Sequence, residues 1–158
     1  MKKGKLASIS CTLLLVLCMF CLSFDVHAEE SRKQIDGSYL THEREAIGYD
    51  TKITRGEDLL AGYSKCVRLA NGNLYVGGST IACQTVERIG IAVAVERAKE
   101  EDTTWEGYDA WIVRDKNADK VSSAKELKVE GGYYYRVVCT HSANDDMSSS
   151  LTDGVFIE

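Results

Sequence analysis

The sequence predicts an all-β domain, a seven-stranded antiparallel sandwich. From Leu59 onward, short apolar segments are separated by turn residues at regular intervals, which is typical of antiparallel sandwiches and barrels. Tyr133–His141 is a run of aromatic and β-branched residues without a breaker, and Gly131-Gly132 directly before it supplies a turn. Between Ile89 and Val95, large apolar residues alternate strictly with small ones, which is the period of a strand.

The chain begins with the pattern of a secretory signal peptide. Three lysines precede an uncharged run from Leu6 to Phe24, and Val26-His27-Ala28 then fits the residues that a signal peptidase reads. An uncleaved membrane anchor is the alternative, but the Ser and Thr content of the run and the cleavage site favour removal. We therefore expect residues 1–28 to be cleaved and the protein to be secreted, with no membrane attachment afterwards.

Residues 29–58 are expected to form a polar N-terminal extension that is partly disordered. Apolar residues are sparse there, with Leu40, Ile47 and Tyr49 standing among charged and polar neighbours. His42-Glu43 starts like a zinc-binding helix, but the second histidine of that motif would fall at Ala46. A metalloprotease is therefore excluded.

Residues 59–158 are expected to form the sandwich. Asn71-Gly72-Asn73 is typical of a hairpin turn, and Gly77-Gly78 indicates a bulge in the strand that follows it. The expected strands are Tyr63–Leu69, Leu74–Val86, Ile89–Arg97, Trp105–Val113, Val121–Val129, Tyr133–His141 and Leu151–Ile157.

One segment of this domain also fits a helix. Ala92–Glu101 is rich in Ala, Glu, Lys and Arg, which are good helix formers. The strict alternation that precedes it and Thr103-Thr104-Trp105 after it favour a hairpin with a charged turn at Lys99–Asp102. We therefore predict two strands here.

The aromatic strand near the C-terminus has a predicted core face. Because side chains alternate, Tyr135, Val137 and Cys139 share one face with Tyr133 and His141. The pattern of Leu127, Gly131-Gly132 and this strand resembles the E–F corner and F strand of fibronectin type III domains. The resemblance implies an immunoglobulin-like or fibronectin type III-like topology.

A second resemblance spans residues 37–158. The run Glu130-Gly131-Gly132-Tyr133-Tyr134-Tyr135-Arg136-Val137 is followed by His141 and by Thr152-Asp153-Gly154, and Gly48-Tyr49-Asp50 lies upstream. Together they resemble a family of small secreted proteins of unknown function from Gram-positive, clostridia-type bacteria. This likeness implies secretion and a β-domain, and it implies no active site.

Charge limits the partners of the protein. The whole chain has a formal net charge of −5, and the part after the leader is more acidic, since the leader holds three lysines and one aspartate. Such a balance argues against nucleic acid and against anionic membranes or wall polymers as electrostatically steered partners.

Three cysteines remain after the leader, namely Cys66, Cys83 and Cys139. No CxxC spacing is present among them, so a zinc or redox site is not indicated, and no cofactor is expected. An immunoglobulin-like topology implies that Cys83 and Cys139 face each other across the sheets, so a disulfide between them is the one pairing we consider. The alternative is that all three stay thiols.

The sequence offers one candidate ligand face and two weaker candidate sites. Trp105, Asp109 and Trp111 lie on the same side of a strand, and this mixed character is typical of a partly exposed binding face. His141 could act as a base or metal ligand, but no nucleophile stands at a recognised spacing, so a hydrogen-bonded structural residue is favoured. Calcium binding by Asn144-Asp145-Asp146 with Asp153 lacks the ligand spacing of an EF-hand, which favours a solvated turn.

These observations predict a secreted, non-enzymatic sandwich that binds an extracellular protein or glycan. The alternative is a small hydrolase or calcium-dependent module that uses His141 with nearby carboxylates. A cleft that brings His141 into hydrogen-bond reach of Asp or Ser would favour the enzyme, and a solid sandwich with an aromatic face would favour binding.

Overall fold

The computed structural model describes residues 32–52 and 56–158, and within these ranges every regular element is a strand. The all-β prediction is confirmed. The predicted signal peptide, residues 1–28, lies outside the described residues. No helix among the described residues has the length and apolar character needed to cross a membrane.

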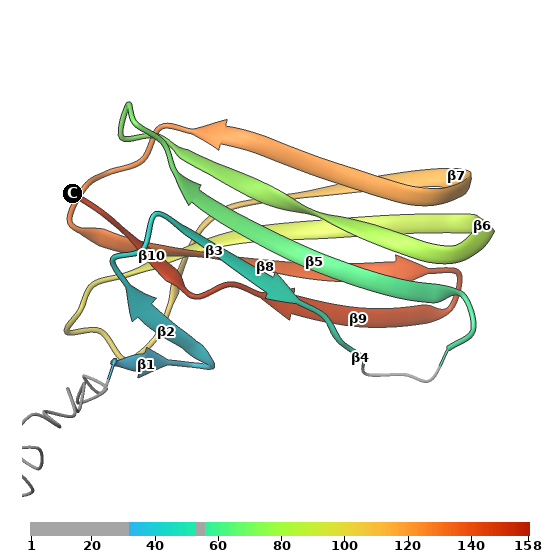
Figure 1. The fold of residues 1–158 in the computed structure, drawn as a ribbon, viewed down its shortest axis with the longest axis horizontal. Helices are drawn as coiled ribbons and strands as arrows, with labels where there is room; N and C mark the ends of the chain where they lie inside the picture. The colour runs from blue at the N-terminus through green and yellow to red at the C-terminus, as the bar shows by residue number, and fades with distance from the viewer. Residues whose placement is uncertain (1–31, 53–55) are drawn as a thin grey trace, which may run out of the picture. The chain divides into compact units, whose positions relative to one another are not determined.

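The domain contains ten strands (Figure 1). They are β1 (Gln34–Ile35), β2 (Ser38–Thr41), β3 (Glu45–Tyr49), β4 (Thr51–Lys52), β5 (Leu59–Arg68), β6 (Leu74–Ala98), β7 (Glu106–Leu127), β8 (Tyr133–Ala143), β9 (Asp146–Leu151) and β10 (Gly154–Ile157).

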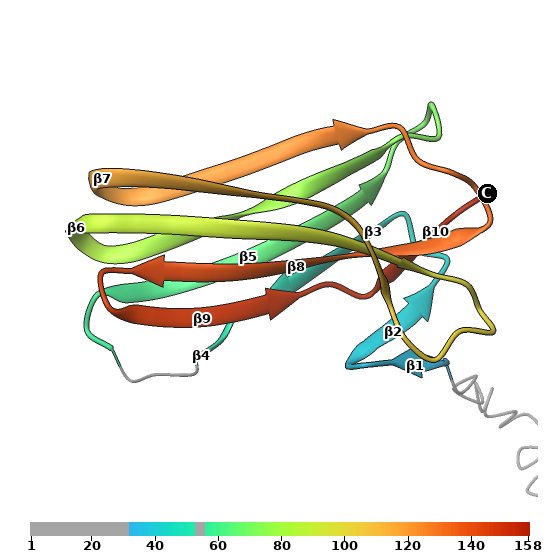
Figure 2. The ribbon, with the colours of Figure 1, turned by 180° about the vertical axis from the view of Figure 1, so that it is seen from behind.

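The long strands β6 and β7 form a hairpin that bends back on itself and so creates two layers. The β6–β7 register shifts between Ile81 and Val86, and both ribbons turn sharply at that end of the molecule (Figures 1 and 2). Before the bend β6 pairs with β5, and after it β6 pairs with β8, while β7 accompanies it on both sides. One continuous sheet is thereby folded into an open half-barrel whose two layers face each other.

The core lies between these layers. Ile89, Ile91, Val93 and Val95 point inward from β6 and are at most 2% exposed, as the alternation predicted. The predicted core face of β8 is likewise buried, since Tyr135, Val137, Cys139 and His141 are each 0% exposed. Tyr135 also fixes the corner between β7 and β8, because its hydroxyl donates to the Glu130 carbonyl at 2.8 Å and accepts from the Glu130 amide at 3.2 Å.

The predicted N-terminal extension is wrong for the described residues after Arg32. Strands β1, β2 and β3 lie in it, β2 pairs in parallel with β10, and β3 pairs with β5. Ile35 and Leu40 are 2% and 7% exposed and form a second, smaller apolar cluster with Ala98 and Tyr134. Sparse apolar residues sufficed because neighbouring strands supply backbone hydrogen bonds, which hydropathy does not reveal.

The predicted strand list needs three further corrections. Ten strands with one parallel pair replace the seven antiparallel strands of an immunoglobulin-like sandwich. The segments predicted as 74–86 and 89–97 are one strand, β6, and those predicted as 105–113 and 121–129 are one strand, β7. Gly77-Gly78 is no bulge, because the β5–β6 register continues through it without a shift.

Two local predictions are confirmed. The hairpin turn between β5 and β6 contains Gly72 with φ of 80°, a conformation that glycine adopts without strain. The segment that also fitted a helix is strand up to Ala98, and the turn after it is closed by the Lys99 amide, which donates to the Asp102 carboxylate at 2.7 Å.

Candidate ligand-binding groove

A groove crosses the outer face of the layer formed by β5, the first half of β6 and the second half of β7. Its cavity measures about 190 Å³. The side chains around it come from neighbouring positions of the three strands, in which Tyr63 is paired with Ser79, Lys65 with Gly77 and Gly77 with Ala124. The residues that line it are Tyr63, Lys65, Tyr75, Gly77, Gly78, Ser79, Ser122, Ser123 and Ala124.

Gly77 forms the floor of the groove. A Cβ at this position would lie 2.3 Å from the Ser123 carbonyl oxygen and 2.6 Å from the Ala124 Cα, so the packed backbone of β7 requires glycine there. Gly77 is paired with Lys65 on β5 and with Ala124 on β7, and Ala124 adds only a methyl group to this part of the groove. The central position is therefore low, and the taller side chains on either side of it make the walls.

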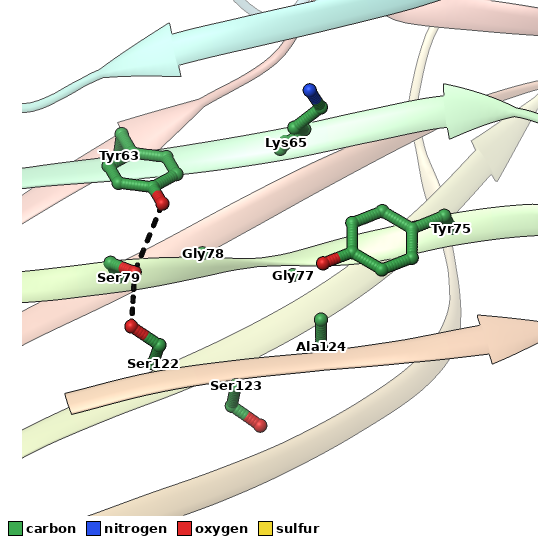
Figure 3. A pocket seen from close by; sticks show the side chains of 9 residues that line it. All are labelled: Tyr63, Lys65, Tyr75, Gly77, Gly78, Ser79, Ser122, Ser123 and Ala124. Carbon is green, nitrogen blue, oxygen red and sulfur yellow. Dashed lines mark hydrogen bonds between the residues drawn. The ribbon is translucent and has the colours of Figure 1, made fainter.

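Two tyrosines form these walls. Tyr63 on β5 and Tyr75 on β6 lie on opposite sides of Gly77 and Gly78 (Figure 3). Their positions are separated along the strands by about 13 Å, because Tyr63 is paired with Ser79, which follows Tyr75 by four residues at ~3.3 Å each. Tyr75 is 41% exposed, so much of its ring is open to a ligand.

A chain of hydroxyl groups orients the Tyr63 end. Ser79 Oγ donates to Tyr63 Oη at 3.2 Å and lies 2.5 Å from Ser122 Oγ (Figure 3). Since the single Ser79 proton goes to Tyr63, Ser122 donates to Ser79. The proton of Tyr63 is then left to donate to a ligand in the groove.

The groove carries little net charge. Lys65 is its one ionisable amine, and its Nζ lies 3.1 Å from the carboxylate of Glu45 on β3. Both side chains are partly exposed, so this ion pair is weak. The groove has aromatic walls, hydroxyl donors and acceptors, and a lysine whose charge is balanced by Glu45. Such a site suits a neutral polar ligand.

Two residues of the predicted ligand face, Asp109 and Trp111, both contact Lys125. Lys125 from the other half of β7 lies with its Nζ 4.0 Å from the Trp111 ring centroid and 3.3 Å from the Asp109 carboxylate. The indole N–H of Trp111 donates to Ser123 Oγ at 2.8 Å. These contacts tie the two arms of β7 across the open edge of the half-barrel, so the pair is engaged in the fold.

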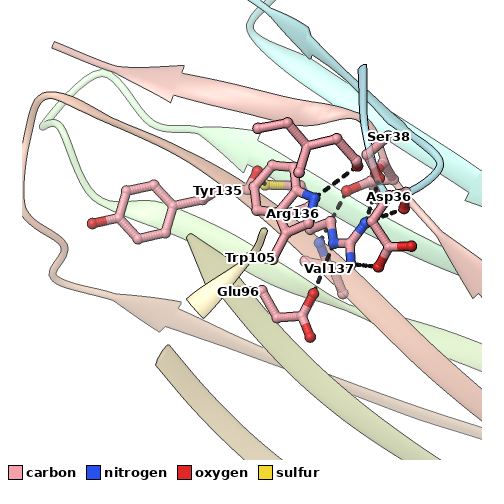
Figure 4. Close-up of polar contacts among 10 residues, drawn as sticks. Asp36, Ser38, Glu96, Trp105, Tyr135, Arg136 and Val137 are labelled. Carbon is pink, nitrogen blue, oxygen red and sulfur yellow. Dashed lines mark hydrogen bonds and ion pairs between the residues drawn. The ribbon is translucent and has the colours of Figure 1, made fainter. Parts of the chain in front are cut away.

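Trp105 lies in a different cluster, apart from Asp109 and Trp111. Its indole N–H donates to the Ile35 carbonyl at 2.8 Å, and the Arg136 guanidinium stacks 4.6 Å from its ring centroid (Figure 4). It precedes β7, whereas the prediction placed it within a strand. The three predicted residues therefore form no single face, because Trp105 lies outside β7 and a register shift opposite Gly107 and Asp109 interrupts the alternation before Trp111.

Arg136 organises the cluster around Trp105. It is 5% exposed and donates to the carboxylate of Glu96 at 2.7 Å, to the carbonyl of Asp36 at 2.7 Å and to Ser38 Oγ at 3.2 Å (Figure 4). Its Nη2 also lies 3.2 Å from the Asp36 carboxylate. These bonds join β8, β6 and the β1–β2 hairpin. Trp105 and Arg136 therefore hold the N-terminal segment against the rest of the domain.

His141 is a buried core residue. Its Nδ1 lies 2.8 Å from Thr80 Oγ1 and its Nε2 lies 2.8 Å from Ser150 Oγ. Burial lowers the pKa of the imidazole to about 4, against a smaller opposing effect of Asp50. His141 and Ser150 are 0% and 2% exposed, and neither lines any of the three cavities described in this structure. Ser150 thus lies within hydrogen-bond distance of His141, but neither residue lies in one of the described cavities.

The carboxylates considered for calcium are separated by the fold. Asp145 pairs with Arg88, Asp146 accepts from the amides of Asp58 and Leu59, and Asp153 accepts from the amide of Tyr39. Across residues 32–52 and 56–158, no three acidic, histidine or cysteine side chains gather in a metal-binding group.

The possible disulfide between Cys83 and Cys139 is absent. Cys66, Cys83 and Cys139 are all free thiols, and Cys83 is exposed at the bend of β6 whereas Cys139 is buried between the layers. The predicted inward orientation of Cys83 failed because the register shift between Ile81 and Val86 interrupts the alternation at this point.

Sequence reasoning did not assemble the groove. The sequence pattern predicts only a bulge at Gly77-Gly78, and the lateral pairing that brings Tyr63, Ser79 and Ser122 together is not visible in it. The alternation of Tyr75, Gly77 and Ser79 on one face of a single strand was the signal available. Searches with the chain found no match among protein-family profiles, curated protein sequences or solved structures.

Proposed function

We propose that this protein is a secreted, non-enzymatic binding domain that holds an extracellular glycan in the groove between Tyr63 and Tyr75. The observation that carries the proposal is a bare glycine floor between two tyrosine walls, with hydroxyl groups along one side. A sugar ring presents an apolar face of C–H groups and a rim of hydroxyls. The tyrosine rings match the face, and the hydroxyl groups of Tyr63 and Ser122 match the rim.

The site is built on rigid elements, which supports binding without rearrangement. All the lining residues belong to β5, β6 and β7, and their backbones are paired across the groove. A preformed site costs little conformational entropy when a ligand enters. The enclosed position of His141 and Ser150 supports binding over the alternative of hydrolysis, since a substrate has no path to them in the described cavities.

The test is a glycan array followed by titration calorimetry with the wild type and two matched variants. Tyr75→Ala removes the exposed wall, and Tyr39→Ala removes a tyrosine of nearly equal exposure, 42%, on β2. We expect Tyr75→Ala to weaken binding at least tenfold and Tyr39→Ala to leave it unchanged, while both melt near the wild type. No glycan bound by the wild type, or equal losses in the two variants, would refute the proposal.

Secretion is tested separately. The proposal supposes that the leader, residues 1–28, is removed on export. Intact mass of protein from the culture medium should then correspond to a chain that starts at Glu29. Recovery of the full-length chain in the membrane fraction would instead make the protein anchored and would leave the groove proposal to stand on the glycan data.

A further inference from the structure

A second cavity, of about 380 Å³, lies on the outer face of the other layer, near the bend of β6 and β7. It is remote from the Tyr63–Tyr75 groove in the sheet, since its residues belong to the second half of β6, the first half of β7, the end of β8 and the turn between β8 and β9. The lining residues are Arg88, Ile89, Arg114, Asp115, Lys116, Ser142, Asn144 and Asp145.

Three cations stand together in this cavity. Arg88 on β6 is paired directly with Lys116 on β7, and Arg114 occupies the next position on the same face of β7. Like charges placed directly opposite each other on antiparallel strands destabilise the pairing. This arrangement therefore has a cost in the free protein that an anion between the cations would remove.

The acidic residues nearby do not neutralise the cluster. Arg88 reaches Asp145 at 3.4 Å, but the two side chains are 62% and 99% exposed, so this pair is weak. Asp115 also lines the cavity, but its carboxylate accepts from the Lys116 amide at 2.7 Å and makes no ion pair among the described residues. Within residues 32–52 and 56–158, Arg114 and Lys116 have no ion pair at all.

The floor and the rim of the cavity add space and donors. Gly90 lies between Arg114 and Ser142 across three strands, and a Cβ there would lie 2.9 Å from Ser142 Oγ. Asn144 fixes the rim, because its Oδ1 accepts from the Arg88 amide at 3.1 Å and its Nδ2 donates to Asp58 at 2.8 Å. The Arg88 backbone is thus held in place beside the open space.

We propose that this cavity binds a tetrahedral oxyanion, a phosphate or sulfate group. Two arginines and a lysine line it, and arginine forks match the oxygens of such anions with paired hydrogen bonds. Ser142 supplies a hydroxyl at the edge of the same space. The local positive charge is opposite in sign to the net charge of the chain, so anionic ligands are directed to this face in particular.

The same group could arrive as a free ion, on a polymer or on a lipid, and four probes separate these sources. They are inorganic phosphate, inorganic sulfate, a sulfated oligosaccharide, and vesicles whose lipids carry phosphate headgroups. Binding is measured at constant ionic strength by amide chemical shifts in NMR spectra, with vesicle flotation for the last probe. The variants are the double substitution Arg114→Gln with Lys116→Gln, and Lys120→Gln, which removes one positive charge outside the cavity on the other half of β7.

We expect saturable shifts at the amides of Arg88, Gly90 and Ser142 with at least one probe, and the probe that binds most tightly names the source. The double variant should lose this binding tenfold or more and melt at or above the wild-type temperature without ligand, since it relieves the like-charge pairing. Lys120→Gln should bind as the wild type does. The proposal is overturned by shifts that do not saturate with any probe, or by equal losses in the double variant and in Lys120→Gln.

Discussion

His141 Nδ1 lies 2.8 Å from the Oγ1 of Thr80, which itself donates to the Gly90 carbonyl at 3.0 Å. Because the proton of Thr80 is used in that second bond, Nδ1 carries the imidazole proton and donates to Thr80. Nε2 is then unprotonated and accepts from Ser150. The histidine is neutral with both nitrogens satisfied, and a second proton would place a charge in the core.

The first prediction is a loss of stability in acid caused by His141. Burial lowers its pKa to about 4 in the folded protein, from about 6.5 when unfolded. Between these values the unfolded chain binds a proton that the folded chain does not, so lowering the pH favours unfolding. We expect this group to cost roughly 3 kcal/mol by pH 4, measured by urea unfolding from pH 7 to pH 4.

His141→Gln is the control for this effect. The variant is less stable at pH 7, because the glutamine does not match both hydrogen bonds, but it lacks the titrating group. Its free energy of unfolding should therefore fall less steeply between pH 6.5 and pH 4. Parallel curves for the two proteins would show that His141 does not titrate as proposed.

The second prediction concerns the contact between Gly62 and the His141 ring. A Cβ on Gly62 would lie 2.3 Å from the ring, which is held by two hydrogen bonds and has no room to move. Gly62→Ala should therefore destabilise the domain by about 1–3 kcal/mol through overpacking. Gly107→Ala is the matched control, since no atom lies within 4 Å of its Cβ position, and it should be neutral or slightly stabilising. Thermal melts that rank the two variants the other way would contradict the packing described.

The third prediction concerns the N-terminal segment, which the sequence pattern assigns to a partly disordered extension and which the fold places in strands. A chain that starts at Tyr49 lacks the buried side chains of Ile35 and Leu40 and leaves Arg136 without Asp36. We expect a loss of roughly 3 kcal/mol or more from apolar burial and from the lost partners of the buried Arg136, which keeps only the carboxylate of Glu96. A chain that starts at Arg32 should have the same melting temperature as the mature protein. Equal melting temperatures for all three chains would show that β1 and β2 contribute nothing.

The fourth prediction is that one thiol reacts in the native protein. Cys83 is exposed, whereas burial raises the pKa of Cys139 to about 12 and raises that of Cys66 still further. Since the thiolate is the nucleophile, iodoacetamide at pH 8 should modify Cys83 alone until the protein is denatured. Peptide mapping identifies the site, and Cys83→Ser should abolish native labelling. Native labelling at Cys139 would mean that the layers open readily.

Local patterns were enough to predict the strand content and much of the core. Alternation placed Ile91 and Val137 inside correctly, and turn residues located the hairpin at Gly72. These features depend on neighbours in sequence, so a single chain reveals them. The bend in β6 was not predicted because residues near Cys83 have no glycine or proline to mark it, and the fold is set by which strands the two halves pair with.

The candidate sites were harder for the same reason. Trp105 and Trp111 share a strand face only if the strand includes both, and β7 begins at Glu106. The groove depends on Tyr63 lying beside Ser79 and Ser122 across three strands, a relationship that lateral register alone decides. The sequence of a single segment does not reveal its register with the neighbouring strands.

The parallel pairing of β2 with β10 has a consequence for the order of folding. Ser38 Oγ donates to the Thr152 carbonyl across 114 residues of sequence, and Gly154 is paired with Leu40. The β1–β2 hairpin therefore has no partner strand until β10 (Gly154–Ile157) is in place. Contacts between such distant residues form slowly, because a long loop must close first. The β6–β7 hairpin joins strands that are neighbours in sequence, so we expect it to form before β2 pairs with β10.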